Sequence, residues 1–276
     1  MKKLLSPLCV LAILFLSACS NAEHDKSTQE AAHKDSSTKI QDVTNPAIGE
    51  QAAKADSISV TEVSVFTAPN GKTYEFTYMD PNVEEMERGR DAPLNCDAVN
   101  FDGHDRKVAK ISLSTAATET FANLGDFLAT LQRTNDAFMI DHQLISRDEN
   151  NNRVREEKRN VKISSVFLYA IKREPDNDYH IIIGNGRGVF FNIECSGLPG
   201  RNSRDYNRLL TARNQVEDYF GVLCNSKYKV FSAGIPVSVR GSLFYDIDHR
   251  PGVVGPEGYK PKTSWEIHPI RSIEFL

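Results

Sequence analysis

The chain has 276 residues, with 33 Lys and Arg against 37 Asp and Glu, which gives a formal net charge of −4. This length is enough for one ordinary domain, or for one and a half. A mildly acidic chain lacks the basic footprint that binding to a nucleic-acid backbone requires, which argues against nucleic acid as a partner.

The N-terminus begins with a positive stretch and a short apolar run. Lys2 and Lys3 precede residues 4–16, which are apolar apart from a serine and a proline. This run is too short to cross a bilayer, which takes ~20 apolar residues, so residues 1–18 are predicted to be a signal peptide. Their removal takes away two lysines and no acidic residue, so the mature chain is more acidic still.

The end of the apolar run, Leu16-Ser17-Ala18-Cys19, resembles the bacterial lipobox. The resemblance implies cleavage before Cys19 and lipidation of its thiol, with attached acyl chains such as palmitate anchoring the chain to the cell envelope. The alternative is an ordinary secretory signal with a chance cysteine. In lipoproteins Asp after the cysteine favours the inner membrane, so Ser20 favours the periplasmic side of the outer membrane. Residues 19–57 have almost no large apolar side chains and are predicted to be a disordered tether.

Residues 58–157 are predicted to form a smaller region of hairpin and helix. Two β-rich runs flank Asn70-Gly71, which is a strong hairpin signal. Residues 118–133 carry apolar side chains at helical spacing and are predicted to form an amphipathic helix. Weaker signals indicate a loop or short helix at 80–90, a short strand at 108–113 and a solvated charged loop at 147–158.

Residues 158–276 carry the clearest pattern. Five β-rich runs occupy residues 161–171, 179–183, 189–195, 236–246 and 265–275. A helix with Ser203 as its expected N-cap and Gly221 as its stop lies between the third and fourth runs. This order predicts a five-stranded OB-like barrel in a mainly β protein with helices (α+β).

Four motifs occur in order along this part of the chain. They are EPDNDYHIIIG at 174–184, NIECSGLP at 192–199, AR at 212–213 and WEIHP at 265–269. Together they resemble a group of functionally uncharacterised bacterial proteins, many of them exported, that share a DxDxH strand and a WEIHP-type ending. The resemblance covers about residues 158–276. It implies an OB-like, nuclease-like barrel and brings no established activity, because a shared fold does not transfer chemistry.

Strand alternation predicts one polar cluster on the barrel. A hairpin centred near Gly186 sets His180 opposite Asn192 and Asp178 opposite Glu194. The expected members from the second, third and fifth strands are Asp178, His180, Asn192, Glu194, Glu266 and His268. Such a set suits a divalent metal or acid–base chemistry. The alternatives are a hydrogen-bond network that fixes strand register, or solvated side chains on an exposed face.

Three further residues attract attention. Arg213 lies on the apolar stripe of the predicted helix, where it is expected to clamp the helix to the barrel; the alternative is a surface pair with Glu217. His249 lies in a Gly/Pro-rich loop between the fourth and fifth strands, which either lines the binding face or is a plain surface loop. Trp265 is either a stacking platform or core.

Three cysteines follow Cys19, which allows one disulfide and one thiol, or three thiols. Cys195 ends the third strand and Cys224 follows the helix, so a Cys195–Cys224 bridge is the predicted pair; Cys96 is the third cysteine. The alternative for Cys195 is a free thiol packed inside the barrel. No CxxC spacing is present, so a structural zinc site is not expected.

Two functional hypotheses follow. The first is a lipid-anchored, non-catalytic envelope module that binds a protein, glycan or small molecule on the face of strands two, three and five. The second is a metal-assisted hydrolase, nuclease-like or phosphodiesterase-like, that uses the His/carboxylate cluster. The sequence names no cofactor, metal or substrate.

Overall fold

A computed structural model describes residues 62–82, 84–85 and 93–276 of the chain. They belong to one compact unit, Ser57–Leu276. The expected signal peptide, Cys19 and the whole of the expected tether lie outside the described residues. Within the described part, no helix is long and apolar enough to cross a membrane.

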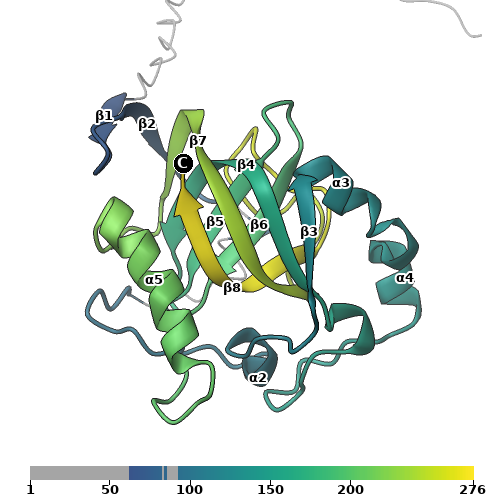
Figure 1. Cartoon of the computed structure of the whole chain (residues 1–276). Coiled ribbons are helices and arrows are strands. Elements are labelled where there is room, and N and C mark those ends of the chain that lie inside the picture. The colour runs from purple at the N-terminus through teal and green to yellow at the C-terminus, as the bar shows by residue number, and fades with distance from the viewer. Residues whose placement is uncertain (1–61, 83, 86–92) are drawn as a thin grey trace, which may run out of the picture. The chain divides into compact units, whose positions relative to one another are not determined.

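Five strands close into a barrel (Figure 1). They are β4 (Asn160–Arg173), β5 (Tyr179–Gly184), β6 (Phe190–Cys195), β7 (Tyr228–Tyr245) and β8 (Trp265–Phe275). The neighbour order is β4-β5-β6-β8-β7, and β7 pairs back onto β4; β6 and β8 are parallel and the other pairs are antiparallel. With helix α5 (Tyr206–Phe220) between β6 and β7, this confirms the predicted OB-like barrel.

Alternation along the strands divides the barrel into two faces. On β5 and β6, side chains such as Ile181, Ile183 and Ile193 are fully buried in the main hydrophobic core. Helix α5 adds Ala212 and Val216 to the same core and ends at Gly221, which has a φ of 76°. The opposite faces of β5, β6 and β8 carry buried polar residues, beside a smaller hydrophobic cluster that includes Ile182 and Phe190.

The N-terminal region extends the barrel sheet to eight strands. The hairpin of β1 (Ser64–Thr67) and β2 (Thr73–Met79), with its turn at Asn70-Gly71, is confirmed and pairs with β7. Strand β3 (Thr118–Asn123) pairs in parallel with β4. Phe76 and Phe127 are buried in the barrel's own core.

The predicted helix over 118–133 is wrong in its first part. Residues 118–123 form β3, and α3 (Leu124–Ala129) begins only where the Asn123 side chain accepts a hydrogen bond from Asp126 N at 3.0 Å. The backbone of β4 supplies a strand partner that a helical pattern cannot reveal. Short helices complete this region: η1 (Gln132–Thr134) and α4 (Asp136–Asp141).

Two other local predictions also differ. Residues 107–110 form the short helix α2 instead of a strand, and Arg153 holds that segment by donating to Ala109 O at 2.7 Å and Ser112 O at 2.9 Å. The charged run at 147–158 is not wholly solvated. Glu157, in η2 (Arg155–Glu157), is fully buried and paired with Arg106 at 2.6 Å.

The predicted Cys195–Cys224 disulfide is wrong. Cys224 bonds to Cys96 instead, with their Cα atoms 5.4 Å apart. Cys195 is a free thiol, buried in the main hydrophobic core. Burial raises the pKa of this thiol to about 12, so it behaves as a packed apolar group.

Candidate functional site

The structure brings the six predicted cluster residues together. Strands β5, β6 and β8 and the turn before β5 supply Asp178, His180, Asn192, Glu194, Glu266 and His268. Each is at most 3% exposed, so the alternative of solvated side chains on an exposed face is wrong. Buried polar groups of this kind need partners, and the partners define what the cluster can do.

The register of the β5–β6 hairpin differs from the predicted one. His180 pairs with Glu194, and Asn192 pairs with Ile182 on one side and Glu266 on the other. The turn is centred at residue 187 instead of 186, and a shift of one residue in the centre moves every pairing by two. A two-residue shift keeps each side chain on its face, which is why the cluster survives the error.

His268 and Asn192 hold the carboxylates in place. His268 Nδ1 lies 2.9 Å from Glu194 Oε2 and 3.0 Å from Glu266 Oε1, and its Nε2 lies 3.3 Å from Asp178 Oδ2. Asn192 Nδ2 donates to Glu266 Oε2 at 2.7 Å and to Glu194 Oε1 at 3.1 Å. Burial opposes a charged His268, but Glu194 and Asp178 outweigh it and raise its pKa well above the ordinary value. His268 therefore carries a proton and fixes the orientation of Glu194.

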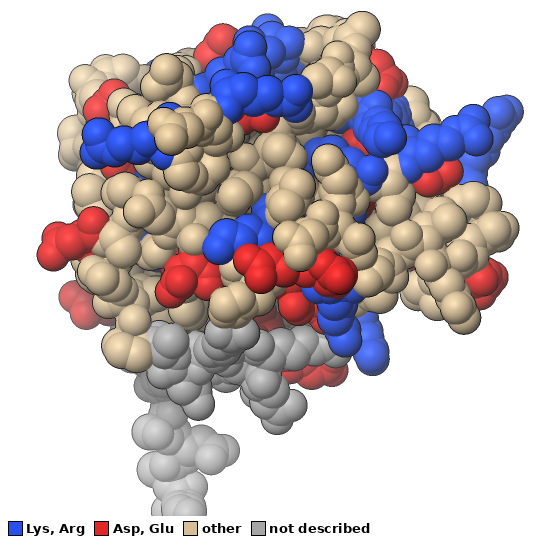
Figure 2. All heavy atoms as spheres, turned by 90° about the horizontal axis from the view of Figure 1, so that it is seen from below, with Lys and Arg blue, Asp and Glu red and all other residues tan. Residues whose placement is uncertain are grey.

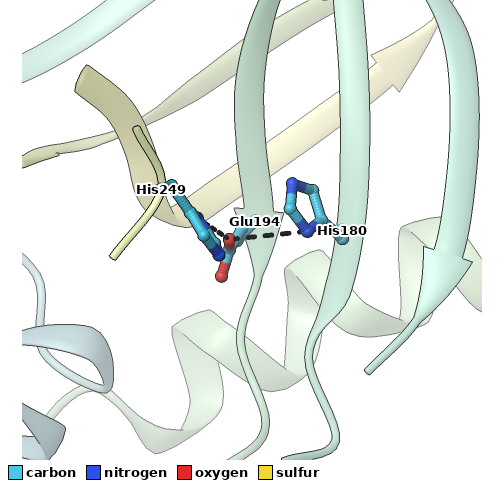
Figure 3. Close-up of side chains that lie close together, drawn as sticks. All are labelled: His180, Glu194 and His249. Atoms are coloured by element: carbon cyan, nitrogen blue, oxygen red, sulfur yellow. Dashed lines mark ion pairs between the residues drawn. The ribbon is translucent and has the colours of Figure 1, made fainter. Parts of the chain in front are cut away.

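His249 joins the cluster from the β7–β8 loop. Figure 3 shows His180 and His249 on either side of Glu194, with Nδ1 of each ring facing Glu194 Oε1, at 3.9 Å for His180 and 3.7 Å for His249. His249 Nδ1 also lies 3.5 Å from Asp246 Oδ2 and 3.4 Å from Glu266 Oε2. Burial opposes its charge, yet Asp246 and the other carboxylates raise the pKa of His249 to about 10.

These spacings separate two kinds of contact. An N–H···O hydrogen bond spans about 2.7–3.2 Å, which fits the two contacts of His268 Nδ1 with Glu194 and Glu266. The contacts of His249 Nδ1 are longer and include one long hydrogen bond, to Glu266 at 3.4 Å. Ligand atoms that each lie about 2.0–2.3 Å from one metal ion are roughly 3–3.7 Å apart. The atoms around His249 match that spacing. Two triads that share His249 each bring their ligand atoms within 4.8 Å of one another: His180, Glu194 and His249, and Asp246, His249 and Glu266. We call these five residues together the candidate metal centre.

A second chain of ion pairs supports His180. Its Nδ1 lies 3.0 Å from Glu174 Oε1, which also pairs with Lys172 Nζ at 2.7 Å. Lys172 in turn pairs with Glu85 at 2.8 Å. Burial would raise the pKa of Glu174, but Lys172 and His180 outweigh it and hold that pKa well below the ordinary value. Among the described residues, the buried Nε2 of His180 has no hydrogen-bond partner.

The centre opens into a pocket of about 470 Å³. Acidic side chains dominate the pocket lining: Glu85, Asp102, Asp105, Glu174, Asp176, Glu194, Asp246 and Asp248. Lys110 and Arg147 oppose them, and Lys110 Nζ lies 3.3 Å from Asp246 Oδ2. Burial disfavours the charged form of Lys110, but Asp246 and its neighbours raise the pKa of this lysine. The pocket is therefore built for positive charge.

The sequence left His249 open between a loop that lines the binding face and a plain surface loop, and the structure places it beside Glu194 in the pocket lining. The sequence pattern missed Asp246. Asp246 and His249 lie three residues apart directly after β7, which is a usable signal, but loop residues have no periodicity that would place them against β6. Asp176, the first Asp of the DxDxH motif, lines the pocket. Trp265 is core, 1% exposed, with its indole N–H donating to Thr134 O at 2.6 Å.

Arg213 is buried at 1% exposure and makes both of the contacts considered for it. Its Nε pairs with Glu217 at 2.9 Å, and its Nη1 donates to Asn177 O at 2.8 Å in the turn before β5. The guanidinium also lies 4.5 Å from the centre of the Tyr179 ring. These contacts join α5 to the segment that carries Asp178.

Comparison of the chain with protein-family models, curated proteins and solved structures finds no match.

Proposed function

We propose that the protein is an exported lipoprotein whose OB-like barrel binds a divalent metal ion at the candidate metal centre. One observation carries this proposal. His249 Nδ1 faces carboxylate oxygens of Asp246, Glu194 and Glu266 at 3.4–3.7 Å; only the contact with Glu266 is a hydrogen bond, a long one, and all three distances match the spacing of ligands around one ion. The function is then that of a lipid-anchored binding module whose ligand includes a metal.

The donor set favours a transition metal. Two imidazole nitrogens suit Zn²⁺, Fe²⁺ and similar ions, whereas carboxylate oxygens also accept Mn²⁺. Ca²⁺ and Mg²⁺ prefer sites made wholly of oxygen. Zn²⁺, Mn²⁺ and Fe²⁺ are therefore the expected ligands, and His249 must lose its proton as any of them binds.

Calorimetric titration of the unlipidated mature chain (Cys19→Ser) with Zn²⁺ and Mn²⁺ tests this. We expect binding to weaken at least tenfold in Glu194→Gln and in His249→Ala. His104→Ala is the matched control, because His104 lines the pocket outside the centre, and it should bind as wild type does. No binding by wild type, or equal affinity in all four proteins, would exclude the metal centre.

A second candidate function, metal-assisted hydrolysis, is favoured by the pocket beside the centre. A metal at its edge would supply Lewis-acid chemistry to a molecule held in the 470 Å³ space. The acidic wall disfavours a polyanion, so a neutral or cationic substrate suits it better than nucleic acid. Metal-loaded protein assayed on nitrophenyl esters and on phosphodiesters tests this candidate; turnover must vanish in His249→Ala and persist in His104→Ala.

The envelope location belongs to the same proposal. Leu16-Ser17-Ala18-Cys19 supports lipidation, and Ser20 supports transport to the outer membrane. The four motifs of residues 174–269 support membership of an exported bacterial family, in which the OB-like barrel is the shared part.

A further inference from the structure

A group of basic side chains lies on the barrel outside the pocket. Lys162 on β4 and Arg240 on β7 are direct cross-strand partners, and Arg240 pairs with Ser272 on β8, next to Arg271. We call Lys162, Arg208, Arg240 and Arg271 the basic patch; none of them lines the pocket. On the face seen from below, Figure 2 shows a group of Lys and Arg side chains at the top of the view, with a few acidic side chains beside it, and a row of acidic side chains lower down.

Most of the patch has no ion pair within the part of the protein that the structure describes. There, none of Lys162, Arg240 and Arg271 forms an ion pair, and Arg240 donates only to the Thr118 hydroxyl. Burial, together with the neighbouring Arg240 and Arg208, lowers the pKa of Arg271, and the Asp205 carboxylate offsets this in part. Arg208, on α5, is the patch member in an ion pair, with Asp205 at 3.0 Å.

Like charges placed opposite one another on neighbouring strands repel and weaken a sheet. Lys162 and Arg240 are such a pair, and the charge of Arg271 lies close to that of Arg240. An external anion that covers these three side chains would reduce their repulsion. Guanidinium groups bind phosphate oxygens in a paired geometry, so phosphate is the anion that this arrangement suits well.

We propose that the basic patch docks the barrel against anionic phospholipid headgroups of the membrane that holds the lipid on Cys19. This rests on the proposed anchoring, which confines the barrel near that surface. Each basic side chain close to an anionic leaflet strengthens binding about fivefold. Four such residues give weak attachment alone, but they orient a chain that a lipid already holds, with the patch toward the membrane.

The test uses the full mature chain with Cys19→Ser, so that no acyl chain contributes, in co-sedimentation with vesicles. Phosphatidylcholine vesicles are compared with vesicles that also contain phosphatidylglycerol, at low and at high salt. We expect binding only to the anionic vesicles and its loss at high salt. Wild type that ignores phosphatidylglycerol, or that binds both vesicles equally, overturns the proposal without reference to any variant.

Charge-matched variants then locate the surface. Lys162→Gln/Arg240→Gln/Arg271→Gln is expected to lose about 100-fold in affinity for anionic vesicles. The control removes the same charge from three exposed arginines elsewhere, Arg133→Gln/Arg187→Gln/Arg250→Gln, and should lose no more than a fewfold. Equal losses in both overturn the proposal, as does a patch variant that still binds vesicles.

Two parallel measurements separate the possible failures. Palmitate labelling of the wild-type chain measures lipidation alone. If the chain takes up no label but still binds anionic vesicles, the proposed anchoring is contradicted and the proposed role of the basic patch is not. Wild-type chain that binds a DNA duplex more tightly than the vesicles, and loses this in the patch variant, makes the patch a nucleic-acid surface and overturns membrane docking. Zn²⁺ titration of each variant shows that the metal centre is unchanged.

Discussion

Replacing Arg213 by Met should cost about 3 kcal/mol of unfolding free energy. The substitution leaves Asn177 O, which accepts from Arg213 at 2.8 Å, without its donor, which costs about 1–3 kcal/mol. It also removes the contact with the Tyr179 ring at 4.5 Å, worth up to about 2 kcal/mol where desolvated. Glu217 loses a partner at 2.9 Å, but it is 21% exposed and still accepts from the Tyr179 hydroxyl, so its cost is small.

Urea denaturation of oxidised protein, followed by circular dichroism, measures this effect. Arg204→Met is the matched control, because Arg204 precedes the same helix with its side chain 63% exposed, and it should change stability by less than about 0.5 kcal/mol. Arg213→Lys keeps the positive charge but loses the planar guanidinium with its several N–H donors, so its loss of unfolding free energy should lie between those of Arg213→Met and Arg204→Met. A stability of Arg213→Met within about 0.5 kcal/mol of wild type would refute the clamp.

Three further outcomes are expected. Cys96→Ala/Cys224→Ala opens a loop of 128 residues and should lose up to about 5 kcal/mol of stability; a variant with wild-type stability in urea would contradict the pairing. Because the folded pKa of His249, about 10, exceeds its ordinary value of 6.5, the folded state holds its proton longer, so the metal-free protein should lose about 1.4 kcal/mol per pH unit between those values. Saturating Zn²⁺ should flatten that slope in pH-dependent melting, and an equally steep slope with metal would argue against His249 as a ligand. Cys19→Ser should abolish palmitate labelling and, at high salt, membrane fractionation, and a Cys19→Ser chain still cut at the same bond and bound to membrane at high salt would contradict the anchor.

The barrel could be predicted from the sequence because each of its strands has a β-rich pattern of its own. Residues 179–183 and 189–195 are β-rich runs with alternating faces, and their faces stay correct when the register moves by two residues. Pattern fails where tertiary pairing decides. Phe121 and Leu124 are spaced as they would be on one helix. However, Phe121 lies in β3, which pairs with β4, and the helix begins only at Leu124, where Asn123 caps it.

The site shows the same division. His180 and Glu194 follow from strand phase, whereas His249 lies in a loop whose path only the folded chain determines. The disulfide depends on the approach of two loops, so Cys224 meets Cys96 across 128 residues of sequence. The burial of the cluster could not be predicted either. The segments around Asp102 and Val254 line the pocket beside the cluster, and their sequences have no pattern that would place them there.

Anomalous diffraction from crystals soaked in Mn²⁺ or Zn²⁺ locates a bound ion without assuming its ligands. We predict one strong peak about 2.0–2.3 Å from His249 Nδ1 and from Glu194 Oε1, with Asp246, Glu266 or His180 completing its coordination. An occupied peak elsewhere on the protein, or crystals of the soaked protein with no peak among these five residues, would contradict a metal centre on the barrel.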